Sequence, residues 1–313
     1  MHIYKHYIEL PKTFQNSSIA IGNFDGMHKG HCKVINQAGI YAHDRGLPWG
    51  VLTFEPHPRE IFDRDKSLFR LTPFDMKVRL IEILGVDFLV VIQFDKDFAN
   101  KTADEFVDQV LVQGFGASYV VSGFNFAFGK KRTGNIRFLQ KKGKNCGFGT
   151  NGISQVLDEN GRVISSTRIR NFLSNGNPRA AANLLGRDYE IEGLVSRGDQ
   201  RGNKIGFPTA NIELDQNIKI ATGVYSITAG VDRGNDTVWH NGIANLGYRP
   251  TFNGNKYMLE AHLFDFDKNI YGANLRVKLI DFIRSEVKFD GVESLTTQIK
   301  KDISISKTIL TSK

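Results

Sequence analysis

The pattern of apolar segments changes near Gly186, and this change constrains the fold more than any other feature of the sequence. Between residues 18 and 121, short strand-like runs alternate with helical segments, which is the pattern of a parallel sheet with right-handed crossovers. From Tyr189 onward, short apolar runs are separated by Gly, Asn and Asp, as in a small antiparallel barrel. We therefore predict an α/β domain over residues 1–186 and a β domain over residues 187–313.

The elements of the first domain are predicted from apolar runs and capping residues. Thr72 before Pro73 predicts a capped helix start, and Thr102 with Glu105 predicts a capping box. We expect strands at Ser18–Ile21, Gly50–Phe54, Phe88–Phe94 and Ala117–Val121. We expect further helices from Thr167 and from Pro178, the latter capped by Asn177 and ended by Gly186.

The second domain is predicted to be mostly strands and to end in a helix. Leu295, Ile299 and Ile303 recur every four residues, which predicts a final helix, and Asp290 is its expected cap. The expected strands are Gly223–Val231, Val238–Leu246, Met258–Phe264 and Leu275–Phe282.

Composition excludes several classes of protein. The longest apolar run, Phe88–Ile92, is far shorter than the ~20 residues of a membrane-spanning helix. The first twenty residues lack the apolar core of a secretory signal, and Cys32 and Cys146 are too few for a disulfide framework. We therefore expect a cytoplasmic protein that has no membrane partner. The 41 Lys and Arg against 33 Asp and Glu give a net charge of +8, which is compatible with anionic ligands.

The turn after the first expected strand carries three glycines and two histidines. The run Gly22–His31 reads GNFDGMHKGH and leads into a helix. Glycines allow a ligand to approach the backbone, and the unpaired N–H groups of a helix N-terminus suit a phosphate. His28 and His31, three residues apart, share one helix face and are able to point at the same anion. This pattern predicts a phosphate site.

The histidine pair is also compatible with two other structures, a zinc site and an exposed helix start. His-x-x-His is half of a zinc site, which would take its remaining ligands from Cys32, His57 or Asp25. The two histidines are also compatible with an exposed, capped helix start. A dinucleotide-binding fingerprint is disfavoured because GxGxxG is absent and the second strand ends in Thr53-Phe54 without the expected acidic residue. The strand–turn–helix context favours phosphate.

Four sequence blocks of this half resemble the prokaryotic FAD synthetases, which carry the HxGH signature of nucleotidylyltransferases. The blocks are Gly22–His31, Thr53–Pro58, Gly123–Gly129 and Ile164–Arg170. The resemblance implies a Rossmann-like nucleotidylyltransferase domain in which His28 and His31 stabilise the triphosphate of ATP. It also implies nucleotide- or phosphate-binding roles at matched positions, namely Gly22, Phe24, Asp25, Gly26, Gly30, Asn125, Ser166, Thr167 and Arg170. Asn125 stands where many synthetases have Asp.

The second half carries a glycine-rich run, Gly198–Asn211, that enters a segment whose direction is set by Pro208. Three glycines with Arg201 and Lys204 suit a backbone cradle for phosphate. Thr209 and Asn211 lie two residues apart in an extended segment, so their oxygens face the same way and are able to hold one Mg²⁺. An ordinary hairpin with Thr and Asn on its wet face remains an alternative.

The second half also carries a glutamate, Glu260, in an expected strand. In Met258–Phe264, alternate residues are apolar, which places Glu260 on the opposite face. A solvated carboxylate is the plain alternative. The run Gly198–Asn211, together with the blocks Gly223–Tyr225, Gly242–Phe252 and Leu259–Gly272, resembles the riboflavin kinases.

That second resemblance implies roles for the matched residues. Thr209 and Asn211 would bind Mg²⁺ with the nucleotide, and Glu260 would be the catalytic base for the ribityl 5′-hydroxyl. Nucleotide-binding roles follow for Gly198, Gly202, Lys204, Gly206, Phe207 and Pro208. Asn203 stands where the kinases often have Arg, which weakens one expected phosphate contact.

Both halves together resemble the prokaryotic bifunctional riboflavin kinase and FAD synthetase family. The resemblance implies that riboflavin and ATP yield FMN, and that FMN and a second ATP yield FAD and pyrophosphate. A monofunctional enzyme, or a nucleotidylyltransferase with another acceptor, is a second hypothesis. The third is a basic RNA-binding protein, although the expectation is that no nucleic acid binds. Its candidate residues are Lys130, Lys131, Arg132, Arg137, Lys141, Lys142 and Lys144. The sequence predicts no oligomeric state.

Overall fold

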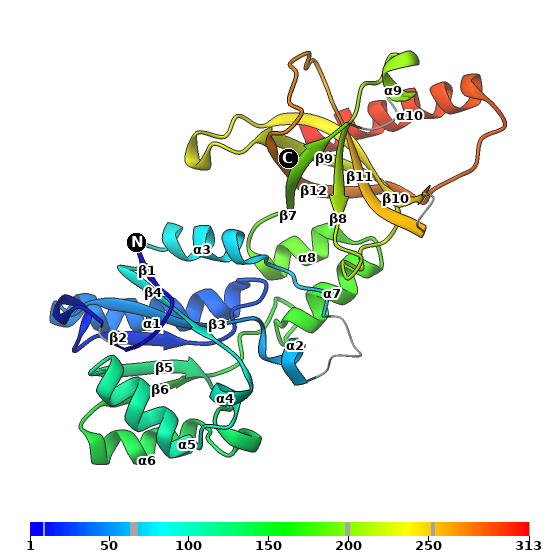
Figure 1. Cartoon of the computed structure of the whole chain (residues 1–313). Coiled ribbons are helices and arrows are strands. Elements are labelled where there is room, and N and C mark those ends of the chain that lie inside the picture. Colours follow the sequence, from blue (N-terminus) through cyan, green and yellow to red (C-terminus); the bar gives the residue numbers. More distant parts are fainter. Residues whose placement is uncertain (9, 63–67, 198–200, 252–253, 313) are drawn as a thin grey trace. The chain divides into compact units, whose positions relative to one another are not determined.

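The computed structural model describes residues 1–8, 10–62, 68–197, 201–251 and 254–312. The chain divides into two compact units, Met1–Ser166 and Thr167–Lys313 (Figure 1). The boundary at Gly186, which the change in sequence pattern predicts, stays a prediction. Among the described residues, no helix combines the length and apolar character needed to cross a membrane.

The first unit contains a six-stranded parallel sheet (Figure 1). Its strands in spatial order are β1 (His2–Tyr4), β4 (Phe88–Gln93), β3 (Trp49–Glu55), β2 (Ser18–Ile21), β5 (Tyr119–Gly123) and β6 (Gly149–Ile153). The four predicted strands are confirmed, with end shifts of one or two residues. The sheet edges β1 and β6 were not predicted, because β1 has three mostly exposed residues and β6 contains two glycines.

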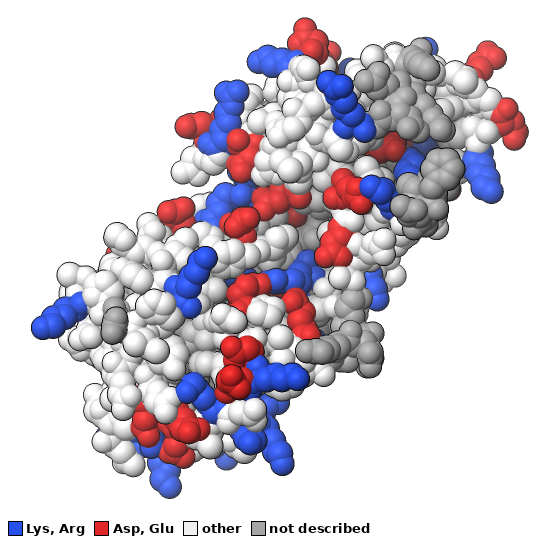
Figure 2. All heavy atoms as spheres, in the orientation of Figure 1, with Lys and Arg blue, Asp and Glu red and all other residues white. Residues whose placement is uncertain are grey.

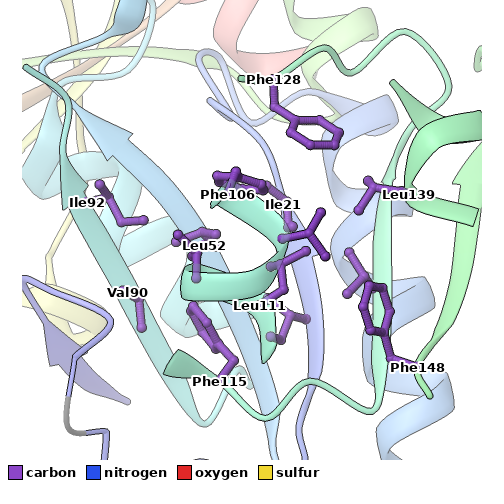
Figure 3. Packing of buried hydrophobic residues seen from close by; sticks show 14 of the residues in the cluster. Ile21, Leu52, Val90, Ile92, Phe106, Leu111, Phe115, Phe128, Leu139 and Phe148 are labelled. Carbon is purple, nitrogen blue, oxygen red and sulfur yellow. The ribbon is translucent and has the colours of Figure 1, made fainter. Parts of the chain in front are cut away.

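Helices cover both faces of this sheet, as the strand sequences require. In β2 and β3, residues with side chains on one face, such as Ile21 and Leu52, alternate with residues of the other face, such as Ala20 and Val51. The second face packs against α1 (Lys29–Arg45) and α3 (Phe74–Ile83). The first face packs against the π-helical segment η2 (Phe106–Gly114) and α6 (Ile136–Cys146), and Figure 3 shows Phe106, Leu111, Phe115 and Leu139 gathered over it.

The predicted helix caps have different outcomes. Thr102 and Glu105 form the expected capping box at α5 (Ala103–Glu105). Asn177 caps α8 (Pro178–Leu185), and Gly186 ends that helix in a left-handed conformation with φ of 80°. The prediction for Thr72 is wrong, because the cap of α3 is Pro73 and the Thr72 hydroxyl accepts a bond from Gly26 instead.

The second unit is built on a closed antiparallel barrel. The strands in order are β10 (His240–Thr251), β11 (Gly254–Leu263), β8 (Ala210–Leu214), β7 (Tyr189–Ser196), β12 (Asn274–Arg284) and β9 (Gly223–Val231). The four strands predicted for this unit are confirmed as β9, β10, β11 and β12, although β10 begins at His240 and extends to Thr251. Leu246, Leu259, Ala261 and Leu275 are among the buried residues, so alternate positions fill the barrel interior.

Helix α10 (Val292–Thr311) follows the barrel and packs against β9, β10 and β12. The final helix is therefore confirmed, but the Asp290 cap is wrong, because Gly291 precedes the first turn and no side chain caps it. Helix α8 packs on β7 and β12. The remaining elements are η1 (Lys12–Phe14), α2 (Pro58–Phe62), α4 (Lys96–Ala99), η3 (Lys130–Arg132), α7 (Ser166–Ser174), α9 (Arg201–Lys204) and η4 (Gly234–Asp236).

Candidate active sites

The first candidate site lies at the carboxyl ends of β2 and β5. These strands are parallel neighbours, with Ile21 beside Ser122, and β3 lies on the other side of β2. The strand order therefore reverses at β2, and ligands of open α/β sheets bind outside the carboxyl ends of the strands at such a point. The run Gly22–His31 follows β2, and the loop with Asn125 follows β5. The fold thus brings two of the predicted motifs to one edge of the sheet.

His28 is the N-cap of helix α1. Its Nδ1 accepts bonds from the backbone N–H of Gly30 at 3.1 Å and of His31 at 3.3 Å. The expectation that these two N–H groups are unpaired is therefore wrong. Because Nδ1 is an acceptor, the proton of the neutral ring is on Nε2. His28 thus caps the helix with one nitrogen and presents an N–H donor with the other.

The second histidine lies directly on the first. The rings of His28 and His31 stack, with centroids 3.6 Å apart and planes inclined by 17°. The Phe24 ring meets His31 edge-on at 5.6 Å, and Phe24 itself is buried. The shared face predicted from the spacing is confirmed. Phe24, which was predicted to be a nucleotide-binding residue, serves here as packing for His31.

The glycines of this turn make room for neighbouring rings. A Cβ on Gly22 would lie 2.9 Å from the Phe24 ring, and a Cβ on Gly30 would lie 3.0 Å from the His28 ring. Gly26 has φ of 96°, which L side chains rarely adopt. These glycines are thus needed by the turn itself, and the predicted contacts of Gly22, Gly26 and Gly30 with a nucleotide stay predictions.

The buried Asp25 carboxylate connects this turn to the segment that precedes helix α3. Asp25 is 4% exposed, and its Oδ1 accepts bonds from the N–H groups of Leu71 at 3.0 Å and Thr72 at 3.1 Å. The Gly26 N–H donates to Thr72 Oγ1 at 2.7 Å. The Ser166 hydroxyl donates to the Asp25 carbonyl at 2.8 Å. Residues predicted to touch the nucleotide are therefore joined to one another.

The remaining phosphate-motif residues are Ser166, Thr167, Arg170 and Asn125. Helix α7 begins at Ser166, so the Ser-Ser-Thr block is at a helix start. Thr167 is exposed and Arg170 is half-buried, and both belong to the second compact unit. Asn125 is exposed in its loop. Their binding roles stay predictions.

The zinc and RNA interpretations find little support in the described parts of the chain. There, no three His, Cys, Asp or Glu side chains gather as metal ligands, and the Cys32 thiol lies 3.6 Å from the Met27 carbonyl. Lys142, one of the seven candidate RNA-binding cations, pairs with Asp104 at 2.6 Å and Asp108 at 3.2 Å. Figure 2 shows acidic side chains interspersed with basic ones over the visible face.

The second candidate site lies on the outside of the barrel. The register of β8, β11 and β10 places Asn211, Glu260 and Asn245 abreast. Directly opposed residues of neighbouring strands present their side chains on the same face. Leu259 and Ala261 are buried inside, so the predicted alternation around Glu260 is confirmed.

Glu260 belongs to a group of charges that the sequence did not reveal. Arg249 Nε donates to Glu260 Oε1 at 2.8 Å, and Arg249 Nη1 lies 3.6 Å from Glu286 Oε1. Asn245 Nδ2 also donates to Glu286 Oε1, at 3.0 Å. The bond to Glu260 raises the pKa of Arg249, so the guanidinium stays charged. Arg249 is in the quoted run Gly242–Phe252, but only barrel closure shows what it contacts.

The glycine-rich run of the barrel contains a single helical turn, α9, where a loop was expected. A Cβ on Gly202 would lie 2.4 Å from the Phe207 carbonyl, and Gly206 has φ of 84°. The Phe207 N–H donates to the Gly202 carbonyl at 2.8 Å. Gly202 is required by the close approach of the Phe207 carbonyl, and Gly206 is favoured by its positive φ. Gly198 and the side chain of Lys204 lie outside the described residues.

His262 ties the Pro208 segment to strand β11. Its Nδ1 lies 2.8 Å from the Pro208 carbonyl, and its ring meets Phe207 edge-on at 5.6 Å. His262 is two residues from Glu260 on the same strand face, so Pro208 and Glu260 are anchored to one strand. The sequence pattern placed His262 on this face but did not indicate its partner.

Asn211, in strand β8, pairs with Glu260 of β11, and Thr209 directly precedes β8. Asn211 Nδ2 lies 3.5 Å from the Thr209 carbonyl, and the Ser196 hydroxyl donates to the Asn211 carbonyl at 3.2 Å. Their side chains offer two neutral oxygen ligands. Mg²⁺ prefers oxygen, keeps several waters and is usually held with substrate phosphates, so this donor set fits it.

Comparisons with known proteins show which families the two halves of the chain match. Residues 10–168 match the FAD synthetase family, and residues 185–310 match the riboflavin kinase family. The bifunctional riboflavin kinase/FMN adenylyltransferase of Haemophilus influenzae is 40% identical over 307 residues, covering 96% of both chains. The protein of that description from Bacillus subtilis is 39% identical over 309 residues, covering 96% of this chain and 95% of its own.

A solved structure shares the fold. It is described as a macrolide-efflux protein from Streptococcus pneumoniae and matches with a TM-score of 0.85 at 31% identity. The match covers 97% of this chain and 98% of that chain. The parallel sheet and the barrel are thus found together in another chain of nearly the same extent.

The role of Asp25 is testable by amide exchange. In Asp25→Ala, the buried N–H groups of Leu71 and Thr72 lose their acceptor, which costs about 1–3 kcal/mol. We expect faster hydrogen exchange at both amides and a lower urea midpoint. Asp25→Asn keeps an oxygen acceptor and should lose less. Asp75→Ala, at an exposed residue of α3, is the control, and an equal effect of Asp75→Ala and Asp25→Ala would contradict the assignment.

Proposed function

Because the chain belongs to the bifunctional riboflavin kinase/FMN adenylyltransferase family, we propose which of its residues carry the two activities. Riboflavin kinase makes FMN, and FMN adenylyltransferase converts FMN to FAD, so the protein is an enzyme of flavin cofactor synthesis. The similarity along nearly the whole chain carries this conclusion. The proposal concerns the residues, the metal and the order of events at each site.

Adenylyl transfer takes place at the carboxyl edge of the parallel sheet. An FMN phosphate oxygen attacks the α-phosphorus of ATP, and the bond from that phosphorus to the β-phosphate oxygen breaks to release pyrophosphate. The reaction needs stabilisation of negative charge more than covalent help. We assign this to the Nε2–H of His28 and to His31 stacked on it. We assign further phosphate contacts to the helix start at Ser166 and Thr167 and to Arg170. The Ser166 hydroxyl proton is already donated to the Asp25 carbonyl, so the side-chain donors of this group are Thr167 and Arg170.

Phosphorylation of riboflavin takes place on the outer face of the barrel. The ribityl 5′-hydroxyl attacks the γ-phosphorus of ATP, and ADP leaves. Glu260 accepts the hydroxyl proton. Arg249 occupies Glu260 Oε1, so we assign the proton transfer to Oε2.

Mg²⁺ accompanies ATP in the barrel site. Thr209 and Asn211 are the residues that would hold it, together with phosphate oxygens and water. When bound, the ion neutralises charge on the transferred phosphoryl group. The pairing of Asn211 with Glu260 in the strand register supports this assignment, since it keeps the oxygen donors beside the base.

The monofunctional hypothesis is tested by products. Pure protein with riboflavin, ATP and Mg²⁺ should yield FMN, FAD, ADP and pyrophosphate, separated by chromatography. Accumulation of FMN without FAD would favour a kinase alone. Supplying FMN directly separates the second reaction from the first.

Replacement of Glu260 should affect one activity alone. In Glu260→Gln, the side chain keeps its shape and an oxygen facing Arg249 but loses the base. We expect riboflavin phosphorylation to slow about 10²- to 10⁴-fold. FAD formation from added FMN should be unchanged. Glu213→Gln is the control, because Glu213 is an exposed carboxylate on the neighbouring strand β8, paired with Lys256. Equal loss of both activities in Glu260→Gln would contradict the assignment of Glu260 as the base of the kinase reaction.

Replacement of His28 should affect the other activity. His28→Ala removes both the ring and the helix cap, whereas His28→Asn removes the ring but supplies a good capping oxygen. We expect both variants to slow FAD formation from FMN by about 10²- to 10³-fold, because the Nε2–H donor is lost. Stability should fall only in His28→Ala. Recovery of the rate in His28→Asn would show that capping, not the ring, is what matters, and a kinase defect of similar size would refute the separation of the two sites.

A further inference from the structure

Lys77, on helix α3, is an unusual residue because its side chain is only 1% exposed. Lysine is almost never fully buried unless paired, since removing its charge from water is costly. Its Nζ lies 3.4 Å from Glu55 Oε2, at the end of strand β3. Solvent, and therefore dissolved substrate, does not reach this ammonium group. Neither proposed reaction uses it.

Glu55 binds a second cation from another segment. Arg70 Nη2 donates to Glu55 Oε2 at 2.8 Å, and Arg70 Nη1 contacts Glu55 Oε1, so the guanidinium grips both oxygens. Arg70 Nε also lies 3.5 Å from Glu60. Burial raises the pKa of Glu55, but Arg70 and Lys77 together bring it below its usual value. Burial lowers the pKa of Lys77, which Glu55 opposes.

The residues that follow Arg70 connect this group of charges to the histidine turn. Leu71 and Thr72 are the next two residues, and their N–H groups bind the Asp25 carboxylate. The Thr72 hydroxyl accepts the Gly26 N–H. His28 follows three residues after Asp25. A continuous path of short contacts and backbone therefore runs from Lys77 through Glu55, Arg70 and residues 71–72 to the turn that carries His28.

We propose that Glu55, Arg70 and Lys77 act as positioning residues for adenylyl transfer. The forked contact of Arg70 with Glu55 fixes residues 70–72, which in turn fix Asp25 and Gly26. Lys77 and Arg70 are the two cations that offset the negative charges of Glu55, Glu60 and Asp25. The group sets the placement of His28 against the phosphates without touching them. This inference rests on the proposed role of His28.

Lys77→Met tests the inference, because methionine fills a similar volume without a charge. A small displacement of a catalytic group is able to cost about 10²-fold in rate. We expect kcat for FAD formation from FMN to fall about 10- to 100-fold, with the KM for ATP changed much less. The riboflavin kinase activity, whose proposed site lies in the second unit, should stay constant, and the urea midpoint of the chain reports whether the first unit stays folded. Lys141→Met, at an exposed lysine on α6, is the matched control.

A double variant separates positioning from mere stability. If Lys77 acts through His28, then Lys77→Met should slow His28→Asn no further, because the group being positioned is gone. Independent effects would multiply instead. Arg70→Lys tests the same path without removing the buried ammonium, since lysine keeps the charge but loses the fork. It should lower adenylyl transfer selectively as well.

The outcomes distinguish this inference from the proposed function. Loss of rate in His28→Asn with full adenylyl transfer in folded Lys77→Met and Arg70→Lys would overturn the positioning role and leave the role of His28 intact. An unchanged rate of FAD formation in His28→Asn would overturn the role that the proposed function gives to His28. Multiplying losses in the double variant, or equal loss of kinase activity, would also overturn the positioning role. A selective loss in Lys77→Met that disappears in the His28→Asn background supports it.

Discussion

The proposed adenylyl-transfer site depends on one buried carboxylate and two backbone N–H groups. Asp25 accepts bonds from Leu71 and Thr72, and these bonds join the turn after β2 to the segment before α3. Phe24 and Met27, on either side, have positive φ, a conformation that non-glycine residues seldom adopt. Such a turn persists only where its surroundings hold it. Asp25 supplies that hold, and the placement of the two histidines follows from it.

The kinase site is organised by strand register rather than by a strained turn. Asn211, Glu260 and Asn245 lie abreast because three strands of a closed barrel pair in one register. A shift of one residue would turn Glu260 into the barrel interior. The buried residues Leu259 and Ala261, on either side of Glu260, oppose such a shift. Packing of the barrel thus fixes the chemistry on its surface.

Local sequence patterns predicted much of the fold, and long-range contacts explain what they missed. The box of Thr102 and Glu105 was predictable because its partners are three residues apart. Thr72 had the same local appearance of a cap, yet its hydroxyl binds Gly26, which is 46 residues away in the chain. The motifs of both proposed sites were readable because the residues assigned to them cluster in short runs of sequence. Arg249, Glu286 and Lys77 were not, since their partners come from other strands and helices.

The placement of the cations changes the meaning of the net charge of +8. Arg70, Lys77 and Arg249, which lie beside the two sites, are each paired with a carboxylate. Their charges are therefore largely neutralised before any phosphate arrives. The groups assigned to the phosphates in the first unit are instead His28, whose Nδ1 accepts two backbone N–H bonds and so leaves the ring proton on Nε2, and His31, which is stacked on it. Neutral donors that are already oriented stabilise charge developing in a transition state without having to reorganise. In the proposed site, the ion pairs therefore supply orientation, and the donors that they orient contact the phosphates together with Arg170.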